Sequence, residues 1–294
     1  MRLRQFFDSQ YVPSRLLGSS IFTVKAYETA ISCVEKAFKR PVKLADLQPS
    51  LLPKFVLYMR SQDLSSATIN NRTLHIRCLW REAWRRGLVK DAPPAARIPE
   101  PRLIKPAWTV DEVSRIIASC QWEVGKIGGV PSCQWWTCLI LVIYDTGCRR
   151  RVIMHTPLAN VFWDQSLILL PGKWQKQKAD QFCAISDQTV AELLKIKDPS
   201  RAALFPWPYD QSLATTYPAL SYHFKGILKR AGLEPSGALF HRLRRTRASY
   251  GEKAVPGSAQ KDLGHSDPKV TQRYLDPRIL GTSRTVDLIP RPVC

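Results

Sequence analysis

Residues 264–277 read GHSDPKVTQRYLDP, in which Tyr274 follows His265 by nine positions. A phenol can act as a nucleophile, and an imidazole beside it can donate or accept a proton. Three further clusters, each with a basic residue, precede this segment. They are TGCR at 146–149, GK at 172–173 and HRLR at 241–244. None of them matches a nucleotide-binding loop such as GxxxxGK(S/T), or GxGxxG after a strand, so the sequence does not imply ATP.

In this order, the four clusters resemble the active-site motifs of the tyrosine recombinase or phage integrase family. That site combines an arginine after a T-G turn, a hairpin lysine, an H-x-x-R helix, an L-G-H turn and a tyrosine nucleophile nine residues further on. The resemblance implies the following catalytic residues: Arg149, Lys173, His241, Arg244, His265 and Tyr274. It also implies that the N-terminal region is a core-binding domain, which clamps DNA, and that the protein is a site-specific DNA recombinase or integrase.

The chemistry of DNA strand cleavage explains these residue types independently. Attack on a phosphodiester builds negative charge on the non-bridging oxygens, which guanidinium groups bind bidentately while staying protonated. We therefore assign Arg149 and Arg244 to a phosphate clamp, and His241 and His265 to hydrogen bonding or proton transfer. A free phenol ionises only at about pH 10, so Tyr274 needs this cationic pocket. The resemblance implies a 3′-phosphotyrosyl bond that conserves the energy for religation, so we expect no cofactor, neither metal nor ATP.

The 5′ oxygen that leaves the phosphorus needs a proton, which in the family comes from a lysine on a flexible hairpin. Lys173 follows Gly172 in the matching position, and Lys176 and Lys178 lie on the same predicted loop. We rank Lys173 first as the general acid and predict a DNA contact for Lys176. The alternative for all three lysines is a solvated hairpin tip that touches the DNA backbone.

The charge of the chain indicates a polyanionic partner, and we expect double-stranded DNA. The 294 residues include 44 Lys and Arg against 24 Asp and Glu, a formal charge of +20. Eight cysteines without a CxxC pair support neither a zinc module nor a disulfide framework. The longest apolar stretch, 135–144, has ten residues, and the first ten residues do not form a secretory signal. We therefore expect no membrane association and a cytoplasmic, prokaryotic, nucleoid-associated protein.

Helical periodicity dominates the chain and predicts a mainly α fold with a small inserted β-sheet. Five prolines between 91 and 107 exclude a continuous helix there. We predict a helical core-binding domain at 1–92, a linker at 93–107, and a tyrosine recombinase catalytic domain with a C-terminal tail at 108–294. The elements expected in the catalytic domain are a capped helix beginning after Thr109, helices at 135–144, 190–196, 222–231 and 243–254, and a β-hairpin of strands 166–170 and 181–185.

The clearest helix of the N-terminal region, residues 69–88, has two faces. Apolar residues recur three and four positions apart on one of them: Ile76, Leu79, Trp80, Ala83, Trp84 and Leu88. Basic residues form a stripe on the other: Arg77, Arg81 and Arg85, with Arg72, Arg86 and Lys90 adding to it. The stripe is either a solvated face or a DNA phosphate contact. We predict DNA contacts for Arg72, Arg77, Arg81 and Arg85.

Two departures from the family pattern bear on catalysis. The family commonly has an acidic residue three positions after the first arginine, where this chain has Val152, and often a histidine at the position of Arg245. These departures leave open a catalytically silent DNA-binding protein of the same fold. An activity like that of type IB topoisomerases, which share the chemistry, also stays open. The family also implies a homo-tetramer on two DNA sites, in which the tail after Tyr274 docks on a neighbouring protomer.

Overall fold

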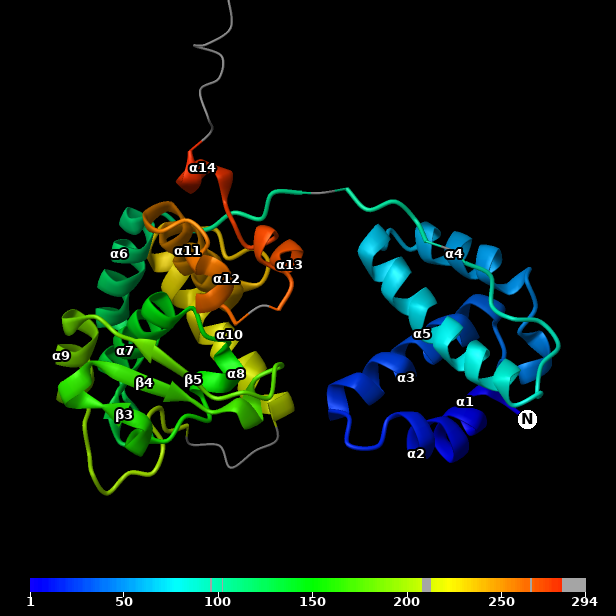
Figure 1. The fold of residues 1–294 in the computed structure, drawn as a ribbon, viewed down its shortest axis with the longest axis horizontal. Coiled ribbons are helices and arrows are strands. Elements are labelled where there is room, and N and C mark those ends of the chain that lie inside the picture. The colour runs from blue at the N-terminus through cyan, green and yellow to red at the C-terminus, as the bar shows by residue number, and fades with distance from the viewer. Residues whose placement is uncertain (96, 102, 208–212, 265, 282–294) are drawn as a thin grey trace, which may run out of the picture. The chain divides into compact units, whose positions relative to one another are not determined.

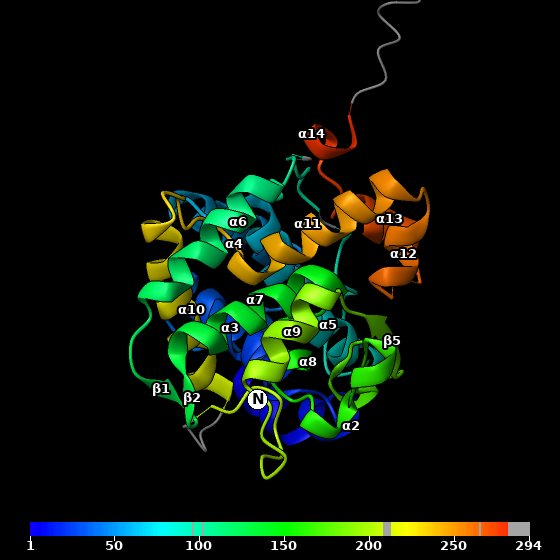
Figure 2. The same ribbon diagram turned by 90° about the vertical axis from the view of Figure 1, so that its left-hand side faces the viewer.

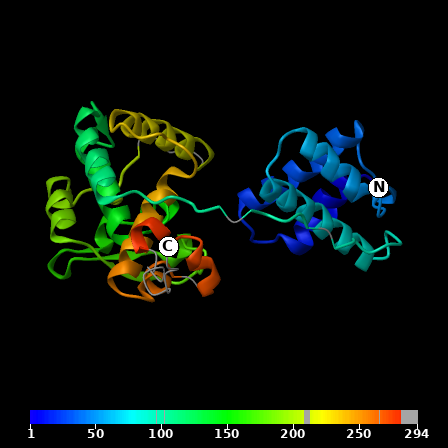
Figure 3. The same cartoon turned by 90° about the horizontal axis from the view of Figure 1, so that it is seen from above.

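The computed structural model describes residues 1–281 except 96, 102, 208–212 and 265, and only the backbone of 213–216. The chain forms two compact units, Met1–Arg102 and Leu103–Cys294. The described residues between 92 and 109 form neither helix nor strand (Figure 3), as their prolines require. The domain limits at 92 and 107 stay predictions, and the predicted docking tail lies outside the described residues from position 282 on.

The first unit is built from helices (Figure 1). They are α1 (Leu3–Phe6), a π-helical turn (Phe7–Tyr11), α2 (Val12–Arg15), α3 (Ile21–Phe38), a 3-10 turn (Leu44–Asp46), α4 (Leu51–Ser61) and α5 (Ser66–Arg85). Serine hydroxyls cap the two longest: Ser20 accepts the N–H of Thr23, and Ser65 accepts the N–H of Thr68. Buried apolar side chains from these helices other than α2 share one core, against which the partly buried Val12 of α2 packs, so this unit carries its own hydrophobic stabilisation.

Helix α5 confirms most of the two-faced pattern. Its residues Ile76, Leu79, Trp80 and Ala83 are fully buried. The prediction was wrong for Trp84 and Leu88, which are 44% and 43% exposed. Trp84 lies one helical step beyond the edge of the buried face, and Leu88 follows the end of the helix at Arg85, so neither continues the stripe.

The second unit combines helices with short strands, which confirms the predicted fold class. Its helices are α6 (Val110–Ser119), α7 (Ser132–Thr146), α8 (Arg150–Ile153), α9 (Asp187–Lys195), α10 (Leu213–Arg230), α11 (Leu239–Ala254), α12 (Ser258–Asp262), α13 (Pro268–Gln272) and α14 (Pro277–Leu280). Short 3-10 turns lie at Cys120–Trp122, Leu158–Asn160, Trp163–Gln165 and Gly172–Trp174. The capping box is confirmed: Thr109 Oγ1 accepts the Glu112 N–H, and a Glu112 carboxylate oxygen accepts the Thr109 N–H.

Two small antiparallel sheets complete this unit. Strands β1 (Lys126–Ile127) and β2 (Val130–Pro131) form one, and β3 (Val161–Phe162), β4 (Leu167–Leu170) and β5 (Gln181–Ala184) form the other in that order. The predicted hairpin is therefore confirmed, with Leu167 paired to Ala184 and Leu170 to Gln181. A Cβ at Gly172 would lie 2.5 Å from the carbonyl carbon of Ala179, so only glycine lets the two arms of the loop approach this closely.

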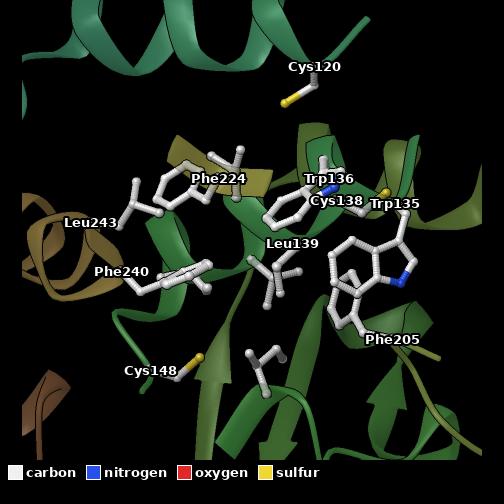
Figure 4. Close-up of a cluster of buried hydrophobic side chains, with 14 of the residues drawn as sticks. Cys120, Trp135, Trp136, Cys138, Leu139, Cys148, Phe205, Phe224, Phe240 and Leu243 are labelled. Atoms are coloured by element: carbon white, nitrogen blue, oxygen red, sulfur yellow. The ribbon is translucent and has the colours of Figure 1, made fainter. Parts of the chain in front are cut away.

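Helix α7 is the centre of the second core and packs against α11 and α9 (Figure 2). Trp135 and Trp136 meet edge to face at 5.0 Å, and Phe224 stacks on Trp136 at 6.1 Å (Figure 4). Phe240 and Leu243 bury one face of α11 in the same cluster. This packing fixes the helix that carries the H-x-x-R motif. Within the described residues, no helix is long and apolar enough to cross a membrane.

Candidate active site

The turn after α7 holds the first predicted arginine. Gly147 has φ 61°, in the left-handed region that favours glycine, and its N–H donates to the Ile143 carbonyl at 2.9 Å. A Cβ on Gly147 would lie 3.1 Å from Arg247 Cγ and 3.2 Å from Leu263 Cδ2, so the turn packs tightly against α11 and the end of α12. Arg149 follows two positions later as the half-buried N-cap of α8. The turn at Thr146 and Gly147 thus places Arg149 at the junction of α7, α11 and the end of α12.

Arg244 lies at that junction. The residue is 4% exposed, its Nη1 donates to the Gly147 carbonyl at 2.6 Å, and its Nη2 donates to the Leu263 carbonyl at 2.8 Å. Burial, and next the charge of Arg149, lower the pKa of this guanidinium to about 10, while Tyr274 acts in the opposite direction. The group therefore stays a cation at neutral pH. It joins the turn before Arg149 to the turn before the predicted second histidine.

Tyr274 lies beside this arginine. Arg244 Cζ is 5.5 Å from the centre of the phenol ring. The tyrosine follows α13 and is half-buried against a small apolar cluster of Ala248, Ala259 and Leu263. The predicted nucleophile and the predicted clamp are thus neighbours within one chain, although 30 positions separate them in the sequence. Opposite partial charges favour this pairing, since a guanidinium is attracted to the face of an aromatic ring.

His241 lies one turn before Arg244 on α11 and is exposed. Loss of hydration and then the charges of four arginines lower its pKa to about 4; Arg244 has the largest effect of the four, followed by Arg149, Arg245 and Arg150. Without DNA the imidazole is therefore neutral at pH 7. It can donate one hydrogen bond and accept another, and it titrates well below the range that its ordinary pKa indicates.

The hairpin loop carries the predicted general acid. Lys173 is exposed on a 3-10 turn, with Nζ 5.4 Å from the centre of the Trp174 ring. The same ring packs against the guanidinium of Arg151, 5.1 Å away, so this end of the loop adjoins α8. Lys176 and Lys178 are exposed further along the loop, and Lys178 has φ 59°. Of the three lysines, Lys173 lies on the part of the loop that is packed beside α8.

Two glutamines fasten this hairpin to the turn after α12. Gln181 Nε2 donates to the Asp262 carbonyl at 2.9 Å, and Gln177 Nε2 donates to the Gly264 carbonyl. Gly264 has φ 62°, in the left-handed region that favours glycine. The predicted catalytic His265 is the next residue and lies outside the described residues. Sequence reasoning missed both glutamines, because nothing in their local pattern distinguishes them from solvated loop residues.

Val152, which stands where the family commonly has an acidic residue, belongs to the core. Val152 is 1% exposed and packs in the cluster around α7. Arg150 fixes α8 instead: its Nη1 donates to the Ser221 hydroxyl at 2.9 Å, and its guanidinium lies 4.1 Å from the centre of the Tyr217 ring. The second departure, Arg245, is 8% exposed. Burial lowers the pKa of the Arg245 guanidinium, so this side chain is a partly desolvated cation on α11.

The arginines of the predicted stripe differ in how exposed they are in the first unit. Arg81 and Arg85 are exposed on α5, and Arg77 is half-buried. Arg72 and Arg86, which were expected to add to the stripe, have hydrogen-bond partners within the first unit. Arg72 Nη1 donates to Cys33 Sγ at 3.1 Å, and Arg86 Nε donates to the buried carboxylate of Glu82 at 2.9 Å.

A basic groove lies where Arg72 points. Its volume is about 680 Å³, and its lining includes Lys25, Lys36, Tyr58 and Arg72, from α3, α4 and α5. The two lysines were missed by sequence reasoning, since they lie eleven positions apart on α3 and form no run or stripe. Three cations around one groove, opposed by Glu28 alone among its lining residues, give it a net positive charge.

Comparisons with known proteins agree with this geometry. Residues 107–279 match the model of the phage integrase family, and residues 3–98 match that of the phage integrase SAM-like domain. The chain is 24% identical to tyrosine recombinase XerC of Lactobacillus leichmannii over 277 residues, which cover 86% of this chain and 87% of the relative. It is 22% identical to tyrosine recombinase XerD of Brucella abortus over 274 residues, which cover 87% of each chain.

Solved structures share the fold. A lambda integrase dimer bound to a COC′ core site aligns with a TM-score of 0.74 at 17% identity, over 97% of this chain and 99% of that one. The Tn1549 transposon integrase in complex with transposon right end DNA aligns with a TM-score of 0.76 at 14% identity, over 98% of each chain. A lambda integrase tetramer bound to a Holliday junction aligns at 0.73 and 17%, over 97% of this chain and 80% of that one.

Proposed function

The chain belongs to the phage integrase family, and we propose that it is a site-specific tyrosine recombinase that cuts and rejoins double-stranded DNA through a 3′-phosphotyrosyl intermediate. One observation carries the proposal. The buried guanidinium of Arg244 contacts the turn before Arg149, contacts the turn before His265, and lies over the ring of Tyr274. A protein that only binds DNA has no need to gather these groups around one buried cation.

Each group has a role in the proposed reaction. The Tyr274 oxygen attacks the phosphorus, the bond to the 5′ oxygen breaks, and Arg149 and Arg244 stabilise the charge on the non-bridging oxygens. Lys173 gives its proton to the departing 5′ oxygen. His241, neutral without DNA, and His265 donate hydrogen bonds to the phosphate or accept the phenol proton. The reverse attack by a 5′ hydroxyl releases the tyrosine and restores the phosphodiester.

The partners follow from the same family. We propose that the basic surface of the first unit, with Arg77, Arg81 and Arg85 on one helix face, contacts DNA phosphates together with Lys176 of the second unit. Arg72 contributes from the basic groove instead. A homo-tetramer on two DNA sites, supported by the lambda integrase tetramer bound to a Holliday junction, is part of the proposal. Action at the prokaryotic nucleoid completes it.

A suicide substrate tests this function. We would use a nicked duplex whose short 5′ fragment diffuses away after cleavage, built on the sequence that the protein selects from a random pool. The wild-type protein should form a covalent complex that resists heat and detergent. Tyr274→Phe removes one oxygen and little volume, so it should bind the duplex with an affinity within about twofold of wild type and form no adduct.

Two outcomes would overturn parts of the proposal. Tight, selective binding by the wild-type protein without any adduct would leave a DNA-binding protein and remove the enzyme. An adduct that persists in Tyr274→Phe would assign the nucleophile to another residue. Mass spectrometry of the tryptic peptide that carries the DNA identifies that residue directly.

A further inference from the structure

A fully buried carboxylate lies two positions after the proposed nucleophile. Asp276 is 0% exposed and precedes α14. Burial by itself raises the pKa of this carboxyl, but hydrogen bonds from Arg278 and from the Ala107 amide outweigh that effect and lower the pKa to about 2. Asp276 is therefore ionised at any working pH. Burying an ionised group is costly unless it is fully hydrogen-bonded, so its partners deserve an explanation.

The two carboxylate oxygens accept hydrogen bonds from two different segments of backbone. Oδ2 accepts the Ala107 N–H at 2.7 Å, and Oδ1 accepts the Arg278 N–H at 3.0 Å. The Arg278 guanidinium adds a bond to Oδ2 at 2.6 Å from a largely exposed position. Ala107 lies 169 positions away from Asp276, at the end of the proline-rich segment. The carboxylate thus links the beginning of the second unit to the segment that directly follows Tyr274.

The backbone of the same residue is fixed to α11. The Asp276 N–H donates to Ser249 Oγ at 2.8 Å, and that hydroxyl lies 3.5 Å from the Tyr274 carbonyl oxygen. Ser249 follows Arg244 by five positions on the helix that also carries His241. The chain directly after the phenol is therefore held on two sides, by α11 and by residue 107.

We propose that Asp276 is a positioning residue for the nucleophile: its buried carboxylate holds the Tyr274 segment between α11 and Ala107, so that the phenol stays beside Arg244. The inference rests on the proposed function and adds a residue to it. Asp276 acts by fixing the path of the backbone and not by touching the substrate, because each of its carboxylate oxygens accepts a hydrogen bond from a backbone N–H. An error of about 1 Å in the position of a reacting atom costs roughly 100-fold in rate.

Asp276→Asn is the informative substitution. An amide has the shape of the carboxylate but only one oxygen, so it places an NH₂ group opposite one of the two backbone N–H donors. We expect single-turnover cleavage of the suicide duplex to slow by about 10- to 100-fold, with DNA affinity within about twofold of wild type. Arg278→Gln is the matched control, since it removes the exposed guanidinium but keeps both backbone bonds. That variant should cleave within about threefold of wild type.

A second assay separates positioning of the tyrosine from damage to the pocket. In a Tyr274→Phe background, hydrogen peroxide supplied in solution can attack the same phosphodiester in place of the phenol. Adding Asp276→Asn to that background should leave peroxide-dependent cleavage unchanged, because the arginines, His241 and Lys173 stay in place. An equal loss in both assays would show that Asp276 supports the fold in general and would overturn the proposal.

Amide exchange tests the contact without DNA. The Ala107 amide, bonded to Asp276, should exchange faster in Asp276→Asn, whereas the neighbouring Trp108 amide, which donates to Thr246 Oγ1 at 2.9 Å, should not change. Unchanged exchange at Ala107, or wild-type cleavage by Asp276→Asn, overturns the positioning role alone. A wild-type protein that forms no adduct at its selected site overturns the proposed function, and the positioning role with it.

Discussion

Replacing Arg244 with methionine separates the structural role of this buried guanidinium from its catalytic role. Methionine fills much of the same volume without a charge or a donor. The fall in the pKa of Arg244 from 12.5 to about 10 corresponds to roughly 3 kcal/mol for keeping the cation buried, a cost that methionine removes. Against this, the hydrogen bonds to the carbonyls of Gly147 and Leu263 contribute about 1.5–3 kcal/mol each, because the donor is charged.

The two effects largely cancel, so we expect Arg244→Met to lower the free energy of unfolding by only about 0–3 kcal/mol. Cleavage should fall by at least about 100-fold, because the transition state loses a preorganised charge that water cannot replace. Urea unfolding followed by tryptophan fluorescence measures the first quantity. Single-turnover adduct formation on the suicide duplex measures the second, and equilibrium binding of the same duplex checks that the substrate is still bound.

Arg244→Lys is the matched control. Lysine keeps the charge but loses the planar fork that reaches the Gly147 and Leu263 carbonyls together, so its cleavage rate should lie between those of Arg244→Met and the wild type. Two results would refute the reasoning. Destabilisation of Arg244→Met beyond about 5 kcal/mol would make the cation mainly structural, and cleavage by Arg244→Met within tenfold of wild type would remove it from the phosphate clamp.

Two further predictions concern pH and salt. The pKa of His241 is lowered from 6.5 to about 4. Between these two pH values the folded protein therefore binds fewer protons than the unfolded chain. The contribution of His241 to stability is thus complete above about pH 6.5 and is lost as the pH falls toward 4; His241→Gln should flatten the fall of Tm there, and an unchanged fall would contradict the assignment. Alanine at Arg81 and Arg85 should reduce the slope of log K against log salt concentration by about 0.9 per lost phosphate contact. Arg86, whose guanidinium is bonded to Glu82, is the control, and Arg86→Ala should leave that slope unchanged. An unchanged slope in Arg81→Ala and Arg85→Ala would return the stripe to a solvated face.

Short-range patterns in the sequence were sufficient for the local elements of this protein. The capping box at Thr109, the helix end at Gly147 and the hairpin of β4 and β5 each depend on residues within 17 positions of one another. The ordered set of arginine, lysine, histidine and tyrosine motifs was sufficient for the family. The excess of positive charge indicated a polyanionic partner, because charge balance is a property of composition alone.

Only the tertiary structure decided which of the motif residues lie next to one another. It also decided which other side chains hold them in place. Gln181 bonds a carbonyl 81 positions away, Asp276 bonds an amide 169 positions away, and Arg72 bonds a cysteine 39 positions away. Helical and strand periodicity report the face on which a residue lies and not the partner that it finds there. The buried carboxylate of Asp276 and the glutamines that bond the turn after α12 have no local sequence signature, since Asp and Gln are common on solvated surfaces. Only long-range packing brings their hydrogen-bond donors and acceptors together.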